Sequence, residues 1–409
     1  MNIKGKMKED KYKIILFVAW YFYPKVGGVE TMLLNQARYF VNTGYKIIIL
    51  TSSSNNLPAE EYIYGIKVIR REYMRGQIHT PTNQIKDDFS AILEKYHPKI
   101  VHFHNGSYPA GVKDRSIGVE VIKNLFKIAK EHGTSIIEHA HNAQIKQPEI
   151  TKPLRELPWD FVICVSKFVK ERWLKLGTRA KNIEVVYNGI DLLQYENAKP
   201  NSKIAKIKQP NNFLIFFPAR VFRISSGEIG EQKNFMLVLK ACRKLNETSK
   251  INFKLLAVSN HKNTNSSDRQ SEKILNKIIG EYKLEDKIVF VPPISPDEMP
   301  NYYAGVDVVC APSINETFGL VYLEAMAAGA IAIASNTGGP REYIKNGENG
   351  FLVDPKDETA LAKLFFRLSH NDFLTKKIKY NARLTAKMFL VKHMCKEIER
   401  IYNKILIAS

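Results

Sequence analysis

The sequence predicts an α/β fold with two doubly wound domains. The chain has 409 residues, which is more than one ordinary hydrophobic core holds. In both halves, short apolar runs alternate with helix-forming segments, as expected for strand–helix–strand units of a parallel sheet. A polar segment rich in Lys and Asn, residues 192–212, separates the halves, and we interpret it as the linker between the domains.

The first half contains six apolar runs that predict strands, namely 13–20, 46–52, 100–103, 135–137, 161–165 and 183–186. Helices are expected over 30–41 and 119–132 and from residue 167 onwards. The segment 53–88 is polar and is expected to be irregular. The run 14–23 follows several lysines but is too short to span a bilayer and lacks a signal-peptide cleavage site, so it is taken as part of the first strand.

The second half repeats this rhythm, with strands expected at 213–217, 253–258, 288–291, 306–310 and 350–354. Helices are expected over 234–245 and 321–328, the latter ending at Gly329 because glycine commonly terminates helices. A hydrophilic loop is expected at 261–269, a further helix from residue 338, and a helical, basic segment from 359 to 409.

Composition indicates a soluble globular protein that attracts anions. Lys and Arg number 61 against 41 Asp and Glu, a net charge of +20. Such an excess suits phosphorylated substrates, nucleic acid or an anionic membrane, although a solvated lysine-rich surface also explains it. The four cysteines, at positions 164, 242, 310 and 395, have no metal or redox spacing, which indicates reduced core residues of a cytoplasmic protein.

The most informative segment is 311–339, which contains Glu316 and Glu324 eight positions apart. If a helix begins near Phe318, the amides of Phe318, Gly319 and Leu320 are first-turn donors that form an anion site suited to phosphate. Gly319 would let a ligand approach the backbone closely. Carboxylates on both sides could bind hydroxyls, so the pattern fits a sugar–diphosphate–nucleoside. The alternative is an ordinary helix N-terminus with Glu324 on a solvated face.

Two H-x-H pairs, His102 with His104 and His139 with His141, raise the question of a metal site. Alternate residues of a strand share one face, so each pair could offer two ligands. No third ligand is evident at a suitable spacing, and no metal site is predicted.

These residues also resemble a known family. The E-x7-E motif with FGL inside it, followed by EAMAAG and GGPRE, resembles the retaining glycosyltransferases of family 4 (GT4). YPKVGGVE, VICVSKFVKERW and YNGID extend the resemblance over nearly the whole chain. It implies a GT-B fold, in which two Rossmann-like domains face each other across a cleft. We therefore expect an acceptor-binding domain at 1–200, a nucleotide-sugar-binding domain at 201–385, and a helix at 386–409 that crosses back to the first domain.

The resemblance also implies roles for individual residues. Arg220 and Lys233 hold the donor diphosphate, although the insertion between them leaves Arg223 as a rival to Arg220. Glu316 holds sugar hydroxyls, and His141 lies beside the donor sugar. Further donor contacts are expected from Gly28, from the backbone of Pro293 and Ile294 at the base, and from Phe318, Gly319, Leu320 and Glu324.

The implied activity is transfer of a hexosyl unit from a nucleoside diphosphate sugar, with uracil the expected base, to an acceptor hydroxyl with retention of configuration. Because the chain contains no D-x-D sequence, we expect cationic side chains and helix amides, with no metal cofactor, to stabilise the leaving diphosphate. Bacterial surface polysaccharide or glycoconjugate assembly, on a glycan, lipid-linked or small-molecule acceptor, is the expected setting.

Several alternatives stay open at this point. A small soluble acceptor fits nearly as well as a lipid-linked one, and a nucleotide-sugar epimerase could use the same scaffold. The net charge of +20 also raises nucleic-acid binding, but a compact basic and aromatic module is absent, so no nucleic-acid partner is expected. We expect a cytoplasmic protein whose basic surface contacts the inner membrane face.

Overall fold

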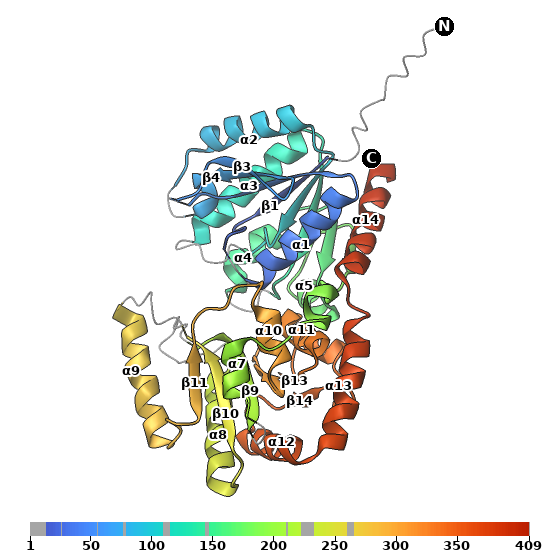
Figure 1. The fold of residues 1–409 in the computed structure, drawn as a ribbon. Coiled ribbons are helices and arrows are strands. Elements are labelled where there is room, and N and C mark those ends of the chain that lie inside the picture. Colours follow the sequence, from blue (N-terminus) through green and yellow to red (C-terminus); the bar gives the residue numbers. More distant parts are fainter. Residues whose placement is uncertain are drawn as a thin grey trace. The chain divides into compact units, whose positions relative to one another are not determined.

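The structure is a computed structural model that describes residues 14–25, 27–54, 56–76, 79–108, 115–143, 147–209, 212–221, 233–259 and 266–408. The chain forms two compact units. Unit 1 consists of residues 1–187 together with 391–409, and unit 2 consists of residues 188–390. Figure 1 shows that each unit contains a sheet with helices packed around it.

Unit 1 is built on an eight-stranded sheet with the order β3-β4-β2-β1-β5-β6-β7-β8. All neighbouring strands are parallel except β3 and β4, which are antiparallel. Its strands are β1 (Ile14–Ala19), β2 (Lys46–Ser52), β3 (Glu60–Ile63), β4 (Ile66–Arg71), β5 (Ile100–His104), β6 (Ser135–Ala140), β7 (Phe161–Cys164) and β8 (Ile183–Val185).

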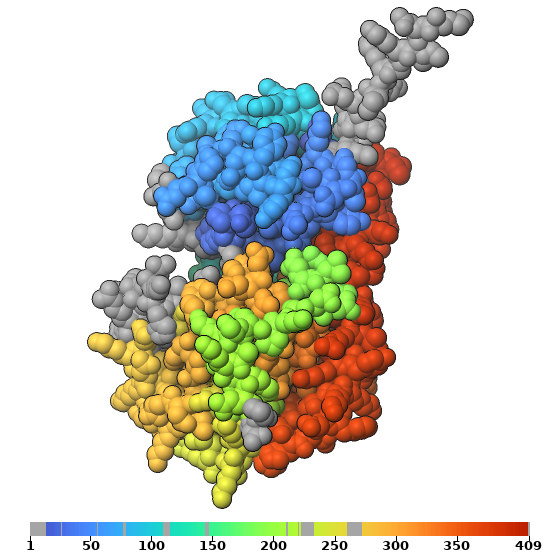
Figure 2. Space-filling view, in the orientation of Figure 1, coloured from blue at the N-terminus to red at the C-terminus, as the bar shows by residue number. Residues whose placement is uncertain are grey.

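The helices of unit 1 are α1 (Gly28–Asn42), η2 (Glu72–Arg75), α2 (Thr82–Tyr96), α3 (Arg115–Glu131), α4 (Pro148–Arg155), α5 (Lys167–Lys175) and α14 (Val391–Ala408). In Figure 2, blue atoms of the segment from α1 to β4 and red atoms of α14 form most of the visible face of this unit. The prediction that 53–88 is irregular is wrong, because β4 pairs with β2 and buries Ile66, Val68 and Ile69. The neighbouring strand β3 consists of exposed and partly exposed residues, which gives this part of the sequence a polar character.

Unit 2 is built on a six-stranded parallel sheet with the order β11-β10-β9-β12-β13-β14. Its strands are β9 (Phe213–Arg220), β10 (Phe253–Val258), β11 (Ile288–Val291), β12 (Val308–Cys310), β13 (Ile331–Ser335) and β14 (Phe351–Val353). Its helices are α6 (Leu192–Glu196), α7 (Ser202–Ile207), α8 (Phe235–Thr248), α9 (Ser266–Glu281), α10 (Met299–Ala304), α11 (Leu320–Ala328), η3 (Gly339–Glu342), α12 (Glu358–His370) and α13 (Asp372–Ala386).

The segment 192–212, expected to be a polar linker, instead contributes α6 and α7 to unit 2. Helix α6 packs against α10 and α11, and Ile204 of α7 is fully buried. Unit 2 therefore starts at Asn188, before the predicted boundary after residue 200. In the segment expected to be a loop at 261–269, residues from Ser266 onwards belong to α9, and 261–265 lie outside the described residues.

The C-terminal helix α14 belongs to unit 1, where it packs on α1. Its Tyr402 hydroxyl lies 2.6 Å from Nδ1 of His102, and its Glu399 accepts a hydrogen bond of 2.8 Å from Tyr45. Arg400 forms an ion pair of 2.6 Å with Glu184. The chain thus completes the first unit with its last residues.

Both sheets have a position at which the order of the strands reverses. In unit 2, β9 lies between β10 and β12, and in unit 1, β1 lies between β2 and β5. Ligands of doubly wound domains bind outside the carboxyl ends of the strands at such switch points. The loops after β9 and β12 are therefore the first place to search in unit 2. Within the described residues, no helix combines the length and apolar character that a membrane-spanning helix requires.

Strand β9 is central to the core of unit 2, which leads to a test. Ile215 is fully buried and pairs with Leu255 on one side and Val308 on the other. We expect Ile215→Ala to lower the free energy of unfolding of unit 2 by about 2–5 kcal/mol, and Ile215→Val by about 0.5–1.5 kcal/mol, because the cavity left is smaller. Urea denaturation measures both, and equal small losses would contradict the assignment of Ile215 to the core.

Candidate functional site

The loop between β12 and α11 carries the most informative predicted residues. Helix α11 starts at Leu320, one residue before the predicted range 321–328 and two residues after the start near Phe318 that the predicted anion site assumed. Gly319 precedes the helix in a left-handed conformation with φ 85° and ψ 63°. Phe318 therefore precedes the helix, with its side chain buried against Tyr343 and Phe389. The helix ends at Ala328, and Gly329 follows it with φ 88°, as predicted.

A buried tyrosine fixes the direction of the backbone amides in this loop. The Tyr343 hydroxyl lies 2.8 Å from the carbonyl oxygen of Phe318 and 2.9 Å from that of Gly319. In a trans peptide the carbonyl and the following N–H point in opposite directions. The amides of Gly319 and Leu320 therefore point away from Tyr343, and neither has an acceptor among the residues that the structure describes. Two oriented amides at a helix N-terminus can bind an anion.

The loop that contains Gly338 and Gly339 packs against the loop between β12 and α11. The amide of Gly339 donates a 2.9 Å hydrogen bond to the carbonyl oxygen of Glu316. A Cβ atom on Gly338 would lie 2.1 Å from that same oxygen, and one on Gly339 would lie 2.0 Å from the carbonyl oxygen of Thr317. Gly338 also has a positive φ of 74°. Glycine is therefore required where the two loops pack backbone to backbone.

Lys233, which the resemblance placed at the donor diphosphate, and Glu316, which it placed at the sugar hydroxyls, come together in the structure. Their side chains form an ion pair of 2.7 Å, and the Glu316 side chain is only 13% exposed. Lys233 precedes α8 and is followed by Asn234, whose side-chain Nδ2 donates to the carbonyl oxygens of Pro312 and Pro355. The ammonium of Lys233 is thus held at the switch point between β9 and β12.

The structure describes the backbone of Arg220 but no part of Arg223. Arg220 is the last residue of β9, at the carboxyl end of the central strand, but the position of its side chain lies outside what the structure describes. Arg223 and the rest of the insertion up to residue 232 also lie outside the described residues. Their contact with a diphosphate stays a prediction.

Glu324 is held by two tyrosines that the sequence reasoning missed. Its carboxylate accepts a 3.0 Å hydrogen bond from Tyr303 of α10 and a further one from Tyr195 of α6. Burial raises the pKa of Glu324, and the two tyrosine hydroxyls oppose that rise. The alternative of a solvated carboxylate is therefore wrong. No spacing in the sequence relates Tyr195 to Glu324, because the contact depends on α6 packing against α11.

The remaining predicted donor contacts lie elsewhere in the fold. Pro293 and Ile294 follow β11, the edge strand of the unit 2 sheet, and Pro293 is exposed. Gly28 belongs to unit 1, where it is the first residue of α1. A Cβ atom on Gly28 would meet no atom within 4 Å, so its side-chain-free surface is open to an approaching group.

His141 follows β6 in unit 1 and is 6% exposed. Its amide donates to Oδ1 of Asn105 at 2.9 Å, and its Nε2 lies 3.2 Å from Nδ1 of His104. Burial lowers the pKa of His141 to about 3, so the ring is neutral at pH 7. It can therefore contact a ligand through hydrogen bonds and not through charge.

The two H-x-H pairs meet in the interior of unit 1. His104 of β5 pairs in register with His139 of β6, and the imidazole nitrogens of His102, His104 and His139 include a set within 4.8 Å of one another. The argument that no third ligand is available is therefore wrong. The register between β5 and β6 supplies the third ligand. Because 30 residues separate the two strands, this register is not visible in the local spacing.

The packing of the two loops in unit 2 leads to a prediction. We expect Gly338→Ala to destabilise unit 2 by more than about 2 kcal/mol, because the new methyl group collides with the backbone of Glu316. The matched control is Gly347→Ala, where φ is also positive, at 78°, but no atom lies within 4 Å of the new Cβ. We expect this control to cost only about 1 kcal/mol. Hydrogen exchange of residues 316–320 should rise only in the Gly338 variant, and equal effects would contradict the close packing.

Comparisons with known proteins follow the division into two units. The family described as "Glycosyltransferase Family 4" matches residues 26–193, and "Glycosyl transferases group 1" matches residues 215–385. The D-inositol 3-phosphate glycosyltransferase of Paenarthrobacter aurescens is 29% identical over 80% of this chain and 81% of its own length.

Solved structures agree with this assignment at the level of the fold. The sucrose-phosphate synthase of Thermosynechococcus elongatus has a TM-score of 0.78 at 19% identity, covering 97% of this chain and all (100%) of that one. Anabaena Alr3699/HepE, solved in complex with UDP-glucose, has a TM-score of 0.73 at 20% identity and covers 96% of this chain and 99% of its own. The chain therefore belongs to glycosyltransferase family 4 and is a retaining glycosyltransferase with the GT-B fold.

Proposed function

We propose that this glycosyltransferase moves a hexosyl unit from a UDP-linked sugar to a hydroxyl of a phosphate-bearing acceptor. The observation that carries the proposal is the pair of oriented amides at Gly319 and Leu320, next to the Lys233 ammonium and the Glu316 carboxylate. Amides and an ammonium attract a diphosphate, and a carboxylate beside them accepts bonds from sugar hydroxyls. The complex of Alr3699/HepE with UDP-glucose supports uracil as the base.

Each end of the donor has a proposed partner. Glu324, held by Tyr195 and Tyr303, accepts hydrogen bonds from the ribose hydroxyls. The backbone of residues 292–294, which follows β11, contacts the base. Lys233 and Arg220 neutralise the diphosphate without a metal cofactor, and Glu316 orients the sugar.

In the proposed reaction, the glycosidic bond to the diphosphate is exchanged for a bond to the acceptor oxygen. The bond between the anomeric carbon and the β-phosphate oxygen breaks, and the short-lived oxocarbenium ion is attacked from the same face by the acceptor hydroxyl. The proton of that hydroxyl passes to the departing phosphate oxygen. The cations and amides around the diphosphate stabilise the charge that develops on it in the transition state. The neutral ring of His141 steadies the sugar by hydrogen bonding.

The acceptor is proposed from charge and from the relatives. The net charge of +20 favours an anionic acceptor. A lipid-phosphate-linked glycan at the inner membrane face would serve bacterial surface polysaccharide assembly. A small polyol phosphate is the second candidate, because relatives include a D-inositol 3-phosphate glycosyltransferase. Transfer of radiolabelled sugar to membrane extracts, compared with transfer to inositol phosphates, distinguishes the two.

One prediction separates binding of the ribose from binding of the diphosphate. Glu324→Gln should weaken UDP binding about tenfold to a hundredfold, since charge-assisted hydrogen bonds contribute about 1.5–3 kcal/mol. Binding of inorganic pyrophosphate should be unchanged, because its partners are Gly319, Leu320 and Lys233. Calorimetry measures both ligands, and Glu348→Gln, an exposed glutamate of the same unit, is the control. Equal weakening of UDP and pyrophosphate would contradict the assignment of Glu324 to the ribose.

The second prediction concerns pH. Glu324 accepts the hydrogen bonds of the ribose hydroxyls most strongly when it is ionised, and burial raises its pKa from 4.5. UDP-glucose affinity should therefore be full well above that raised pKa and should fall as the pH drops through it, at a higher pH than for an ordinary glutamate. Because both tyrosine hydroxyls lower this pKa, Tyr195→Phe and Tyr303→Phe should move the fall to higher pH. Glu324→Gln should abolish it, and a pH profile unchanged in all three variants would disprove the role.

A further inference from the structure

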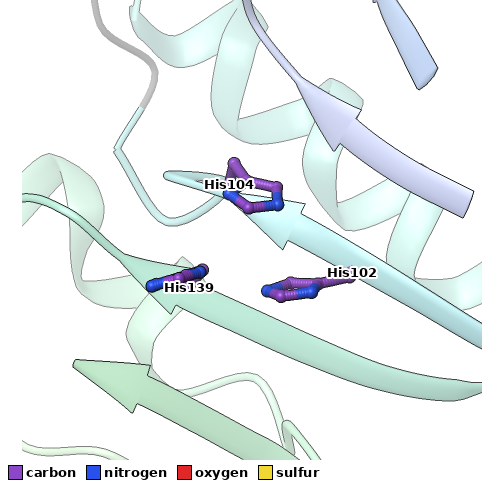
Figure 3. A group of neighbouring side chains, drawn as sticks. All are labelled: His102, His104 and His139. Carbon is purple, nitrogen blue, oxygen red and sulfur yellow. The ribbon is translucent and has the colours of Figure 1, made fainter. Parts of the chain in front are cut away.

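The interior of unit 1 contains a cluster of histidines that the proposed transfer reaction does not use. Its members are His102 and His104 of β5 and His139 of β6, and Figure 3 shows the three rings on one side of the two neighbouring strands. Residues 102 and 104 alternate along one strand, and His139 is the cross-strand partner of His104. The parallel register therefore places three imidazoles on one face of the sheet.

These rings are buried and lack hydrogen-bond partners at several nitrogens. All three side chains are at most 1% exposed. Nε2 of His102, Nε2 of His104 and both nitrogens of His139 have no partner among the described residues. Buried polar atoms are nearly always satisfied, and an unsatisfied group calls for a water, an ion or a functional explanation. A neutral imidazole has one N–H and one lone pair, so these atoms can offer three lone pairs, one from each ring. Three neighbouring lone pairs suit a metal ion.

Contacts outside the cluster determine which nitrogen of His102 and His104 is available to a metal ion. Nδ1 of His102 lies 2.6 Å from the Tyr402 hydroxyl, and Nδ1 of His104 lies 3.2 Å from Nε2 of His141. If both Nδ1 atoms donate their hydrogens in these contacts, both Nε2 atoms carry a free lone pair. A ligating histidine usually donates its other ring N–H to such an outer partner, which sets its tautomer and orientation.

We propose that His102, His104 and His139 bind one Zn²⁺ ion in the core of unit 1, with a water molecule as the fourth ligand. Neutral imidazole nitrogen is a preferred ligand of Zn²⁺, and burial keeps these rings neutral. Glu138 is not part of the site, because it lies on the opposite face of β6 and accepts hydrogen bonds from Ser107.

Binding requires a small rearrangement of the rings. The ligand nitrogens lie within 4.8 Å of one another, whereas Zn–N bonds of about 2.0–2.1 Å in a tetrahedral site place nitrogens about 3.3 Å apart. The rings of His102 and His139 are nearly parallel, with an interplanar angle of 16°. Rotation about χ2 must therefore direct their lone pairs towards one point. The contact between His104 and His141 would then tie the position of His141 to the metal.

The test uses the full-length protein, produced in zinc-supplemented medium and dialysed. We expect about one zinc per chain by elemental analysis, and a visible spectrum typical of tetrahedral Co²⁺ after chelation and cobalt loading. The melting temperature should rise by several degrees on reloading zinc. Less than about a tenth of an equivalent of zinc, with no cobalt spectrum, would overturn the proposal, as would a crystal structure with only waters in the cluster.

Variants locate the ion. His139→Gln breaks no hydrogen bond of the described structure, because neither ring nitrogen has a partner, and it should abolish zinc retention and the cobalt spectrum. His79→Gln, an exposed histidine of the same unit, should retain both. Hydrogen exchange of the β5 and β6 backbone amides, which belong to unit 1, reports whether the His139 variant is folded. Zinc retained by a folded His139 variant, or lost from the His79 variant, would also overturn the proposal.

Discussion

The proposed donor site of unit 2 depends on one hydroxyl group. Tyr343 bonds to the carbonyl oxygens of Phe318 and Gly319, and through the rigid peptide plane it determines where the next two amides point. Gly338 and Gly339 allow a second loop to support this turn from behind. Glu316, which pairs with Lys233, precedes this turn, and helix α11 follows it. Binding an anion through main-chain groups requires this fixed geometry, since amides cannot change rotamer as a side chain can.

Much of this site could be predicted because its residues are close in the sequence. Glu316, Gly319 and Glu324 lie on one strand–loop–helix unit, so their spacing carries geometric information. The anion-site argument assumed a helix start two residues too early, because the left-handed conformation of Gly319 leaves no signal beyond the glycine itself. Lys233 was placed by the family resemblance, and the position of the Arg220 side chain stays a prediction.

The contacts that could not be predicted join segments far apart in the chain. Tyr195 reaches Glu324 only because α6 packs on α11, and this segment has the composition of a linker. Strand β4 was hidden in a polar region, although it pairs with β2 and buries Ile66, Val68 and Ile69. The histidines show the same limit, since each H-x-H pair is visible but the register that joins the pairs is not. Local patterns indicate elements, whereas their partners are set by tertiary packing.

The division of the chain into units has a consequence for biosynthesis. Unit 1 is discontinuous, and Ile398, Ile401 and Tyr402 of α14 are fully buried in its core. A nascent chain that has emerged only as far as residue 390 already contains every segment of unit 2, whereas unit 1 still lacks α14. The ribosome thus delivers the later unit ready to fold before the earlier one is complete, contrary to the usual N-to-C order. A chain that lacks α14 would therefore expose the apolar face of α1, and quality-control chaperones and proteases would recognise that face.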